Sequence, residues 1–123
     1  MNPTTHFLKV DLPADDTSAA DEFWRMSNLY PEQTGLPYYL WISEGQGVRH
    51  GPRVKVARTL SDLPQNMSSV SITEPIMVHS GPSMSNKDIN QLKEWIELNR
   101  ETLLDYWNMQ ASTLATLQRI KRI

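Results

Sequence analysis

The sequence contains no cysteine. Without thiols the chain has no disulfide framework, no thiolate nucleophile and no zinc site built on cysteine ligands. The absence of disulfides is typical of proteins from a reducing compartment. We therefore expect a cytoplasmic protein.

Long hydrophobic runs are missing as well. No stretch approaches the roughly 18 apolar residues that a membrane helix needs, so we expect no membrane as a partner. Residues 1–16 lack the basic region followed by an apolar core that marks a signal peptide. The formal net charge of −2 excludes a generally basic nucleic-acid-binding protein, although it is compatible with a local basic patch.

The residue groups that carry common enzymatic chemistry are also absent. The three histidines, His6, His50 and His79, lie on different segments and do not have the spacing of metal ligands on one helix. The sequence has no G-x-S-x-G elbow, and its five glycines are too scattered for a loop that cradles phosphate. We therefore predict no catalytic residues, no metal site and no cofactor, which favours a non-enzymatic protein.

The clearest feature that is present is an amphipathic helix over residues 85–107. Ser85 is suited to cap this helix, and Asp88 in the first turn lies at the positive end of the helix dipole. Apolar residues recur along the segment at helical spacing (Ile89, Leu92, Ile96, Leu103 and Trp107). This spacing predicts that Trp107 faces the core. Trp95 precedes Ile96, a member of this stripe, and is rotated by roughly 100° from it around the helix axis. We therefore predict that Trp95 is the less buried of the two tryptophans.

Four segments before the helix have the pattern of β-strands. Residues 36–43 are rich in aromatic and β-branched residues, and residues 53–58 alternate apolar and basic side chains. Two shorter extended pieces follow at 69–73 and 76–79. The sequence thus predicts an α+β fold, with a small antiparallel sheet of three to four strands covered by the long C-terminal helix. A short final helix is predicted around residues 114–120.

The first part of the chain differs in charge from the rest. Residues 1–34 carry six acids and two bases, a net charge of −4, whereas the remainder carries ten bases and eight acids. We predict that residues 1–35 form a partly irregular N-terminal extension, with a short strand over 6–10 and one or two helical turns over 21–29. Residues 36–123 are predicted to form a single α+β domain.

Basic residues gather in and around the alternating strand, where they can form a cationic face for phosphate or carboxylate groups. Tyr38 and Tyr39 are adjacent, so one ring points to each face of their strand, and the outward ring can stack on a base or anchor a partner residue. The candidate binding residues are Tyr38, Tyr39, Arg49, His50, Arg53, Lys55 and Arg58. The alternative interpretation is a solvated strand, or an edge strand whose charges prevent pairing with other chains.

Two motifs point to a known family. Residues 50–56 (HGPRVKV) align with a strand motif of the form H-x-P-H-x-H-V, and the predicted helix carries Glu94-Trp95, Leu103-Leu104 and Trp107. Over residues 36–123 the chain thereby resembles the small uncharacterised bacterial proteins grouped as domain of unknown function 4160. Members of that family resemble components of toxin–antitoxin and mobile-element neighbourhoods, which implies a regulatory or inhibitory binding protein.

The sequence departs from this family motif at two positions. Its two later histidines are replaced here by Arg53 and Lys55. A permanently charged pair that only donates hydrogen bonds is suited to binding anions rather than to transferring protons.

Two hypotheses about function follow. The first is a non-enzymatic protein-binding regulator that occludes a protein partner, such as an antitoxin or a phage-type inhibitor of a bacterial defence complex. The alternative is a nucleic-acid-binding protein that uses the basic strand face together with tyrosine stacking.

Overall fold

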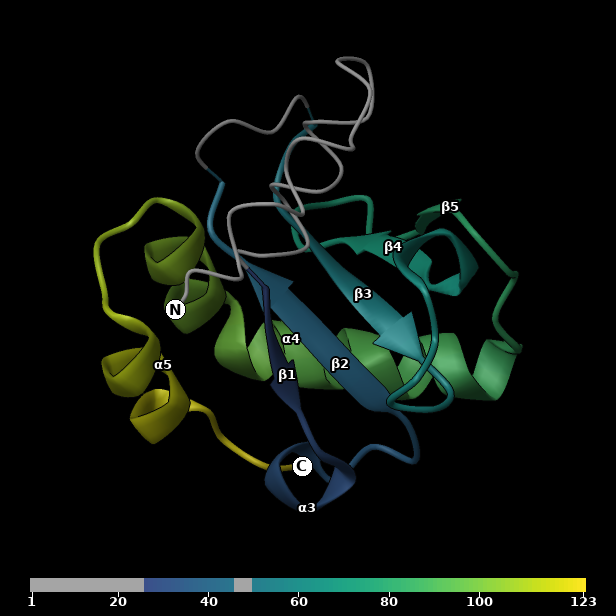
Figure 1. Ribbon diagram of the computed structural model, residues 1–123, viewed down its shortest axis with the longest axis horizontal. Helices are drawn as coiled ribbons and strands as arrows, with labels where there is room; N and C mark the ends of the chain where they lie inside the picture. Colours follow the sequence, from purple (N-terminus) through teal and green to yellow (C-terminus); the bar gives the residue numbers. More distant parts are fainter. Residues whose placement is uncertain (1–25, 46–49) are drawn as a thin grey trace, which may run out of the picture.

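Five short strands pair with their neighbours in chain order to form one antiparallel sheet (Figure 1). The structure, a computed structural model, describes residues 26–45 and 50–123. The strands are β1 (Met26–Leu29), β2 (Tyr39–Ser43), β3 (Arg53–Ala57), β4 (Ser68–Ser71) and β5 (Val78–Ser80). The helical elements are α3 (Pro31–Thr34), the 3₁₀ turn η2 (Pro64–Asn66), α4 (Asn86–Trp107) and α5 (Thr113–Arg119).

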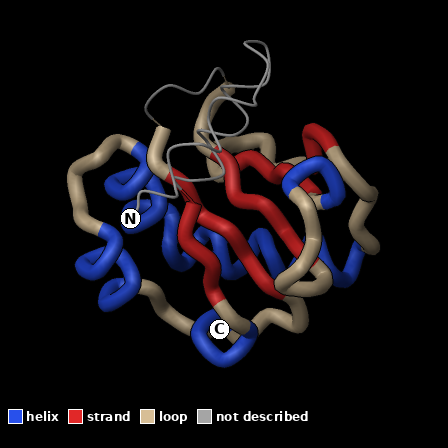
Figure 2. Tube along the Cα trace, in the orientation of Figure 1, coloured by secondary structure: helices blue, strands red, loops and turns tan. Residues whose placement is uncertain are grey.

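Helix α4 lies across one face of the sheet and forms the second layer of the domain (Figures 1 and 2). It begins where the sequence predicts, because the Asp88 backbone N–H donates a hydrogen bond of 3.1 Å to Ser85 Oγ. The predicted α+β fold, with an antiparallel sheet, a long helix and a short final helix, is confirmed. None of the described helices combines the length and the apolar character that crossing a bilayer requires.

The predicted number of strands, three to four, is wrong, because the sheet has five. The additional strand is β1, which lies within the segment 21–29 that we predicted to be helical. Its four residues pair antiparallel with β2, from Met26 opposite Ser43 to Leu29 opposite Leu40. A strand of this length places only two side chains on each face, so its structure is set by pairing with β2 rather than by a periodic pattern of its own.

The N-terminal extension of the sequence analysis is described only from residue 26 onward, and the strand predicted over residues 6–10 lies outside the described residues. From residue 26 the segment contributes β1 and α3. Leu29 in β1 is fully buried in the core, and Gly35 ends α3 with a left-handed φ of 83°. Glycine adopts this φ without the steric cost that a Cβ atom brings.

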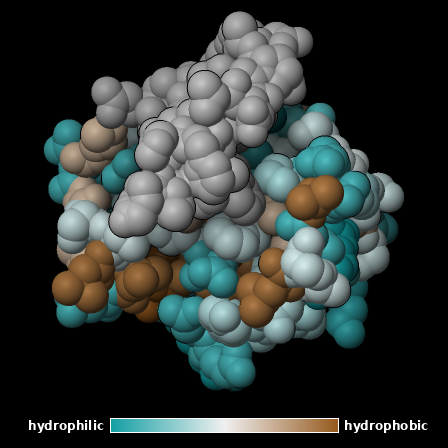
Figure 3. Space-filling view, viewed as in Figure 1, coloured by the Kyte–Doolittle hydropathy of each residue, from teal (hydrophilic) through white to brown (hydrophobic). Residues whose placement is uncertain are grey.

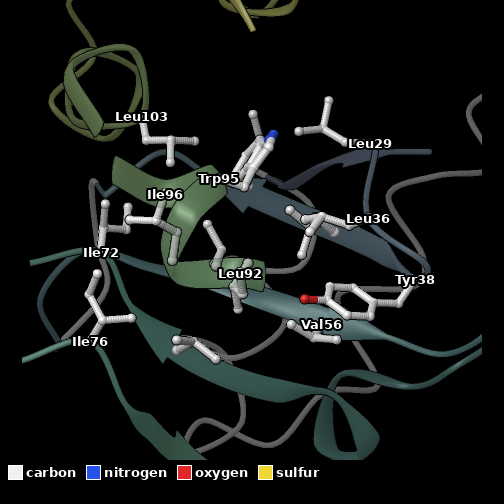
Figure 4. Close-up of a cluster of buried hydrophobic side chains, with 14 of the residues drawn as sticks. Leu29, Leu36, Tyr38, Val56, Ile72, Ile76, Leu92, Trp95, Ile96 and Leu103 are labelled. Carbon is white, nitrogen blue, oxygen red and sulfur yellow. The ribbon is translucent and has the colours of Figure 1, made fainter. Parts of the chain in front are cut away.

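The hydrophobic core fills the space between α4 and the inner face of the sheet (Figure 4). Strand alternation turns one set of apolar side chains toward the helix (Leu40, Ile42, Val54, Val56 and Val70). Trp95 is the largest of the fully buried side chains and enters this layer from α4. Burial of the inner face therefore depends on α4.

The prediction that Trp107 is more buried than Trp95 is wrong. Trp95 has an exposed fraction of 0%, whereas Trp107 is partly exposed at the end of α4. The buried stripe of α4 is centred near Asn99, a polar residue that an apolar pattern does not reveal. Trp107 follows Asn99 by a rotation of roughly 80° at 100° per residue and so lies at the edge of the stripe. Tyr106 occupies the core position instead.

Asn99 also fixes the C-terminal tail. Its Nδ2 donates to the carbonyl oxygens of Trp95 at 3.1 Å and Lys121 at 2.9 Å, and its Oδ1 accepts from the Lys121 N–H at 2.7 Å. Two residues further on, the Ile123 N–H donates to the Thr34 carbonyl at 2.9 Å. The tail is therefore held between α4 and α3 (Figure 1).

Replacing Trp95 by alanine is expected to destabilise the protein by about 3–5 kcal/mol, because it leaves a cavity between α4 and the sheet. Trp107→Ala is expected to cost distinctly less, since this ring is already partly exposed. Urea denaturation followed by far-UV circular dichroism gives both free energies of unfolding. A larger loss for Trp107→Ala would contradict this assignment of the helix face.

Asn99→Ala is expected to lower the free energy of unfolding by about 1–3 kcal/mol, because it removes the hydrogen bonds of a buried amide, two of them to partly buried backbone groups of the tail. It should also speed the hydrogen exchange of the Lys121 amide, which donates to Asn99 in the native protein. Asn90→Ala, at an exposed position of the same helix, is the control. An unchanged exchange rate at Lys121 would show that Asn99 does not hold the tail.

Candidate binding face of the sheet

The face of the sheet that points away from α4, called the outer face below, carries the side chains that alternate with the core residues. On β2 these are Tyr39 and Trp41, and on β3 they are Arg53 and Lys55. All four side chains are partly exposed. The outer face therefore combines two aromatic rings with two permanent positive charges.

One row of directly opposed residues crosses the outer face from edge to edge. Its members, in the order of the strands, are Asn28, Trp41, Lys55, Ser69 and, across an irregularity in the β4–β5 register, Ser80. Directly opposed residues of an antiparallel pair have Cβ atoms about 4.5–5.5 Å apart. Trp41 and Lys55 are thus immediate neighbours at the centre of the sheet, and the rest of the row consists of amide and hydroxyl groups.

The remaining aromatic and basic residues flank this row. Tyr39 lies two residues before Trp41 on the same strand, and its ring meets that of Tyr30 edge-on, with ring centroids 5.5 Å apart and an interplanar angle of 79°. Arg53 lies two residues before Lys55 and is paired with Ser71 on β4. The register therefore places Trp41 opposite Lys55, with Tyr39 and Arg53 on opposite sides of this central pair.

Ser69 is the exceptional residue of the row. Its side chain is only 4% exposed, and its Oγ has no hydrogen-bond partner. A buried polar group without a partner costs about 1–3 kcal/mol. Such exceptions in native structures call for a functional or structural reason. Ser69 lies directly opposite Lys55, so an unpaired hydroxyl and a positive charge meet at the same point of the outer face.

The position of β3 corrects one interpretation of its charges. One interpretation of the sequence is that Arg53 and Lys55 protect an exposed edge from pairing with other chains. β3 is the central strand of the sheet, with β2 on one side and β4 on the other. Its charges therefore have no edge to protect, and the exposed-face interpretation is the one compatible with the structure.

Tyr38 lies on the opposite side of the sheet from Tyr39. It belongs to the core with an exposed fraction of 5%, and its hydroxyl donates to the Asp88 carbonyl oxygen at 3.0 Å (Figure 4). Burial raises the pKa of the Tyr38 hydroxyl well above its ordinary value, and the negative charge of Asp88 raises it further. Tyr39 is therefore the ring of the pair that the outer face presents.

Two of the predicted basic residues, Arg58 and Arg49, are not placed on the outer face by the structure. Arg58 follows β3, and its guanidinium donates to Ser68 Oγ at 2.9 Å and to the Ser83 carbonyl at 3.4 Å, so it links β4 to the segment before α4. Arg49 lies outside the described residues. Arg53 and Lys55 are thus the described cations that share the outer face.

His50 meets the end of α4 instead. Its ring centroid lies 5.8 Å from that of Trp107 at an interplanar angle of 32°, and its Nδ1 lies 2.7 Å from the Gly51 carbonyl oxygen. A carbonyl only accepts hydrogen bonds, so Nδ1 is the protonated nitrogen in this contact. The Gly45 N–H donates to the Trp107 carbonyl at 2.8 Å, and a Cβ atom at Gly45 would overlap the indole. Both ends of the β2–β3 connection are therefore fixed on Trp107.

An apolar surface lies elsewhere on the molecule. Figure 3, which shows the molecule from the side of the outer face, places hydrophobic side chains over α5 at the lower left. Leu114 is 66% exposed and Met109, just before α5, is 50% exposed. A few exposed apolar residues are normal on soluble domains, so this surface carries no functional assignment.

Two members of the outer face, Trp41 and Ser69, are not among the candidate binding residues predicted from the sequence. Trp41 has a signal in the sequence, because it stands two positions after Tyr39 in a strand and therefore shares its face. Ser69 has none, since only the register of β4 against β3 places it opposite Lys55. Within residues 26–45 and 50–123, no three His, Asp or Glu side chains gather as a metal site would require.

Comparison with known proteins gives a resemblance to a family over part of the chain, and no activity. The family model of DUF4160, a domain of unknown function, matches residues 64–108, a partial segment of the chain that runs from η2 through α4. The resemblance to this family is therefore confirmed over the segment that contains Trp95 and Trp107, whereas the motif at residues 50–56 lies before it. No curated protein and no solved structure matches the chain.

Tyr38→Phe is expected to reduce the loss of stability at high pH. Because the folded-state pKa of Tyr38 is raised, the neutral hydroxyl contributes stability that is fully present below the unfolded-state pKa of about 10 and is lost as the pH rises through the folded-state value. Urea midpoints at neutral pH and above pH 10 should therefore differ less for Tyr38→Phe than for the wild type. Tyr39→Phe is the control and should keep the wild-type difference. An equal difference in all three proteins would contradict this role of Tyr38.

Proposed function

We propose that the protein is a non-enzymatic protein-binding regulator, which acts by occluding a partner as an antitoxin or an inhibitor of a bacterial defence complex does. The outer face of the sheet is the proposed contact surface. The observation that supports this proposal is the direct opposition of Trp41 and Lys55, with Tyr39 and Arg53 beside them.

The composition of this surface is that of an interface centre. Trp, Tyr and Arg are the residues in which binding energy is most often concentrated, because each provides a large contact area together with a polar group. Three of these types occur within two adjacent strands here, as Tyr39, Trp41 and Arg53. The rigid strands hold these side chains in place before binding, so little conformational entropy is lost when a partner docks.

The charges indicate the chemistry of the partner. Arg53 and Lys55 favour a surface that is rich in Asp and Glu, because complementary charge speeds encounter and excludes partners of the wrong sign. The proposed partner is therefore an acidic protein surface.

Affinity purification from the native host followed by mass spectrometry tests this proposal. The bait is the wild-type protein beside the triple variant Trp41→Ala, Arg53→Gln, Lys55→Gln, with Lys93→Gln on α4 as the control. An acidic protein should be retained by the wild type and by Lys93→Gln, and lost from the triple variant. Circular dichroism establishes that each bait is folded.

Trp41→Ala alone is expected to weaken binding of the purified partner by about 2 kcal/mol, or roughly 30-fold in Kd. The loss should appear mainly as faster dissociation, because removing an anchor residue changes the dissociation rate more than the association rate. Surface plasmon resonance measures both rates. Binding of equal strength to wild type and Trp41→Ala would place the contact surface elsewhere.

A second candidate function is binding of single-stranded nucleic acid. Aromatic rings on a sheet face with cations beside them are a common arrangement for stacking unpaired bases and contacting their phosphates. Tyr39 and Trp41 supply the rings, and Arg53 and Lys55 supply the charges. The protein-binding proposal takes precedence because the net charge of the whole chain is −2.

Fluorescence anisotropy with labelled single strands separates the two functions. Binding of nucleic acid would weaken steeply with salt, and replacing Arg53 and Lys55 by Gln would reduce the slope of log K against log salt by about 1.4. An anisotropy signal that stays flat at low salt removes the second candidate and leaves the first unchanged.

A further inference from the structure

A groove of about 520 Å³ lies between α3, the first turns of α4 and the C-terminal tail. It is separate from the outer face, because α4 packs on the opposite side of the sheet (Figure 1). The side chains that give the groove its chemistry are Glu32, Leu36, Lys87, Asp88, Gln91 and Arg122. Its size lies within the range of about 300–1,000 Å³ that is typical of small-molecule sites.

The groove contains charges of both signs that do not neutralise one another. Lys87 and Arg122 are positive, and Glu32 and Asp88 are negative, but no ion pair joins any two of these four described side chains. Arg122 uses a guanidinium N–H to donate to the Glu32 carbonyl oxygen at 3.1 Å, which leaves its other donors for a further contact. Four ionic groups therefore line one small groove without satisfying each other.

Gln91, which lines the groove, carries a buried acceptor that is also unsatisfied. Gln91 Oε1 is buried and has no hydrogen-bond partner. Gln91 follows Asp88 by three residues and Lys87 by four, so the helical spacing brings all three side chains to the same side of α4. An amide oxygen in this position requires a donor, and no described protein group supplies one.

We propose that this groove binds a small zwitterion of the free amino-acid type. The ligand carboxylate would lie between Lys87 and Arg122, which offer charged donors to its two oxygens. Its ammonium group would donate to the carboxylates of Glu32 and Asp88, and to Gln91 Oε1 once this side chain turns from its buried position into the groove. A ligand with both charges accounts for opposite side-chain charges and an orphan acceptor in one place, which a simple anion or cation does not.

The apolar part of the groove favours an aliphatic side chain on this ligand. Pro31, the first residue of α3, and Pro37, which precedes β2, keep apolar surface exposed at the groove, whereas Leu36 between them is only 2% exposed. A short aliphatic chain can cover these groups while the charged end reaches α4 and the tail. L-Leucine is therefore the probe of choice.

An NMR titration of the full-length protein tests this inference. L-Leucine should cause saturable shifts in the amide signals of residues 87–91 and 122. N-Acetyl-leucine, which lacks the ammonium charge, and leucine methyl ester, which lacks the carboxylate, should each bind roughly tenfold more weakly or worse. The two analogues carry the same side chain, so they separate recognition of the charges from simple hydrophobic contact.

Matched variants identify the groups involved. Lys87→Gln should weaken leucine binding roughly tenfold, whereas Lys93→Gln on an exposed part of the same helix should leave it unchanged. Gln91→Met keeps the length of the side chain but removes the orphan acceptor, so it should weaken binding without lowering the urea midpoint of the free protein. This second readout distinguishes loss of a ligand contact from loss of folding.

Two results would overturn the inference. The first is an absence of saturable shifts when L-leucine is added to folded wild-type protein. The second is binding of equal strength by leucine and both analogues, which would mean that the charged groups do not recognise a zwitterion. Neither result bears on the proposed protein-binding function, because that function uses the outer face.

Discussion

Packing of α4 against the inner face of the sheet is the interaction on which the rest of the structure depends. Strands of three to five residues, as in this sheet, are not stable without a second layer that buries one face. The 22 residues of α4 form a rod about 33 Å long, which is enough to span five strands. Trp95 lies within this layer and supplies its largest buried side chain.

The outer face is a consequence of the same packing. Because Val54 and Val56 are buried against the helix, strand alternation directs the side chains of Arg53 and Lys55 to the outer face. A slip of one residue would bury both charges, so the core enforces the register that also presents the aromatic and cationic pairs. Trp41 is positioned by the same rule on the neighbouring strand.

Helix α4 also connects the separate surfaces of the molecule. Its first turns line the groove, its middle holds the C-terminal tail through Asn99, and its last residue, Trp107, holds the β2–β3 connection. The segment matched by the DUF4160 family model contains the whole helix. That match therefore covers the helix that packs on the sheet and contacts the tail and the β2–β3 connection, and it does not cover the basic residues of the outer face.

The sequence by itself determined the elements with strong local signals. The cap at Ser85 and the long apolar stripe predict α4, and the alternation of apolar and basic side chains over residues 53–58 predicts β3. Both signals are local, because a cap and a side-chain periodicity depend only on residues close together in the sequence. Only the tertiary structure decided that β1 is a strand, that Trp95 rather than Trp107 is buried, and that Ser69 faces Lys55. Strand β1 is too short to show a side-chain periodicity. The centre of the buried stripe of α4 is the polar residue Asn99, which an apolar pattern does not reveal. The register between β3 and β4 is set by packing of the whole inner face.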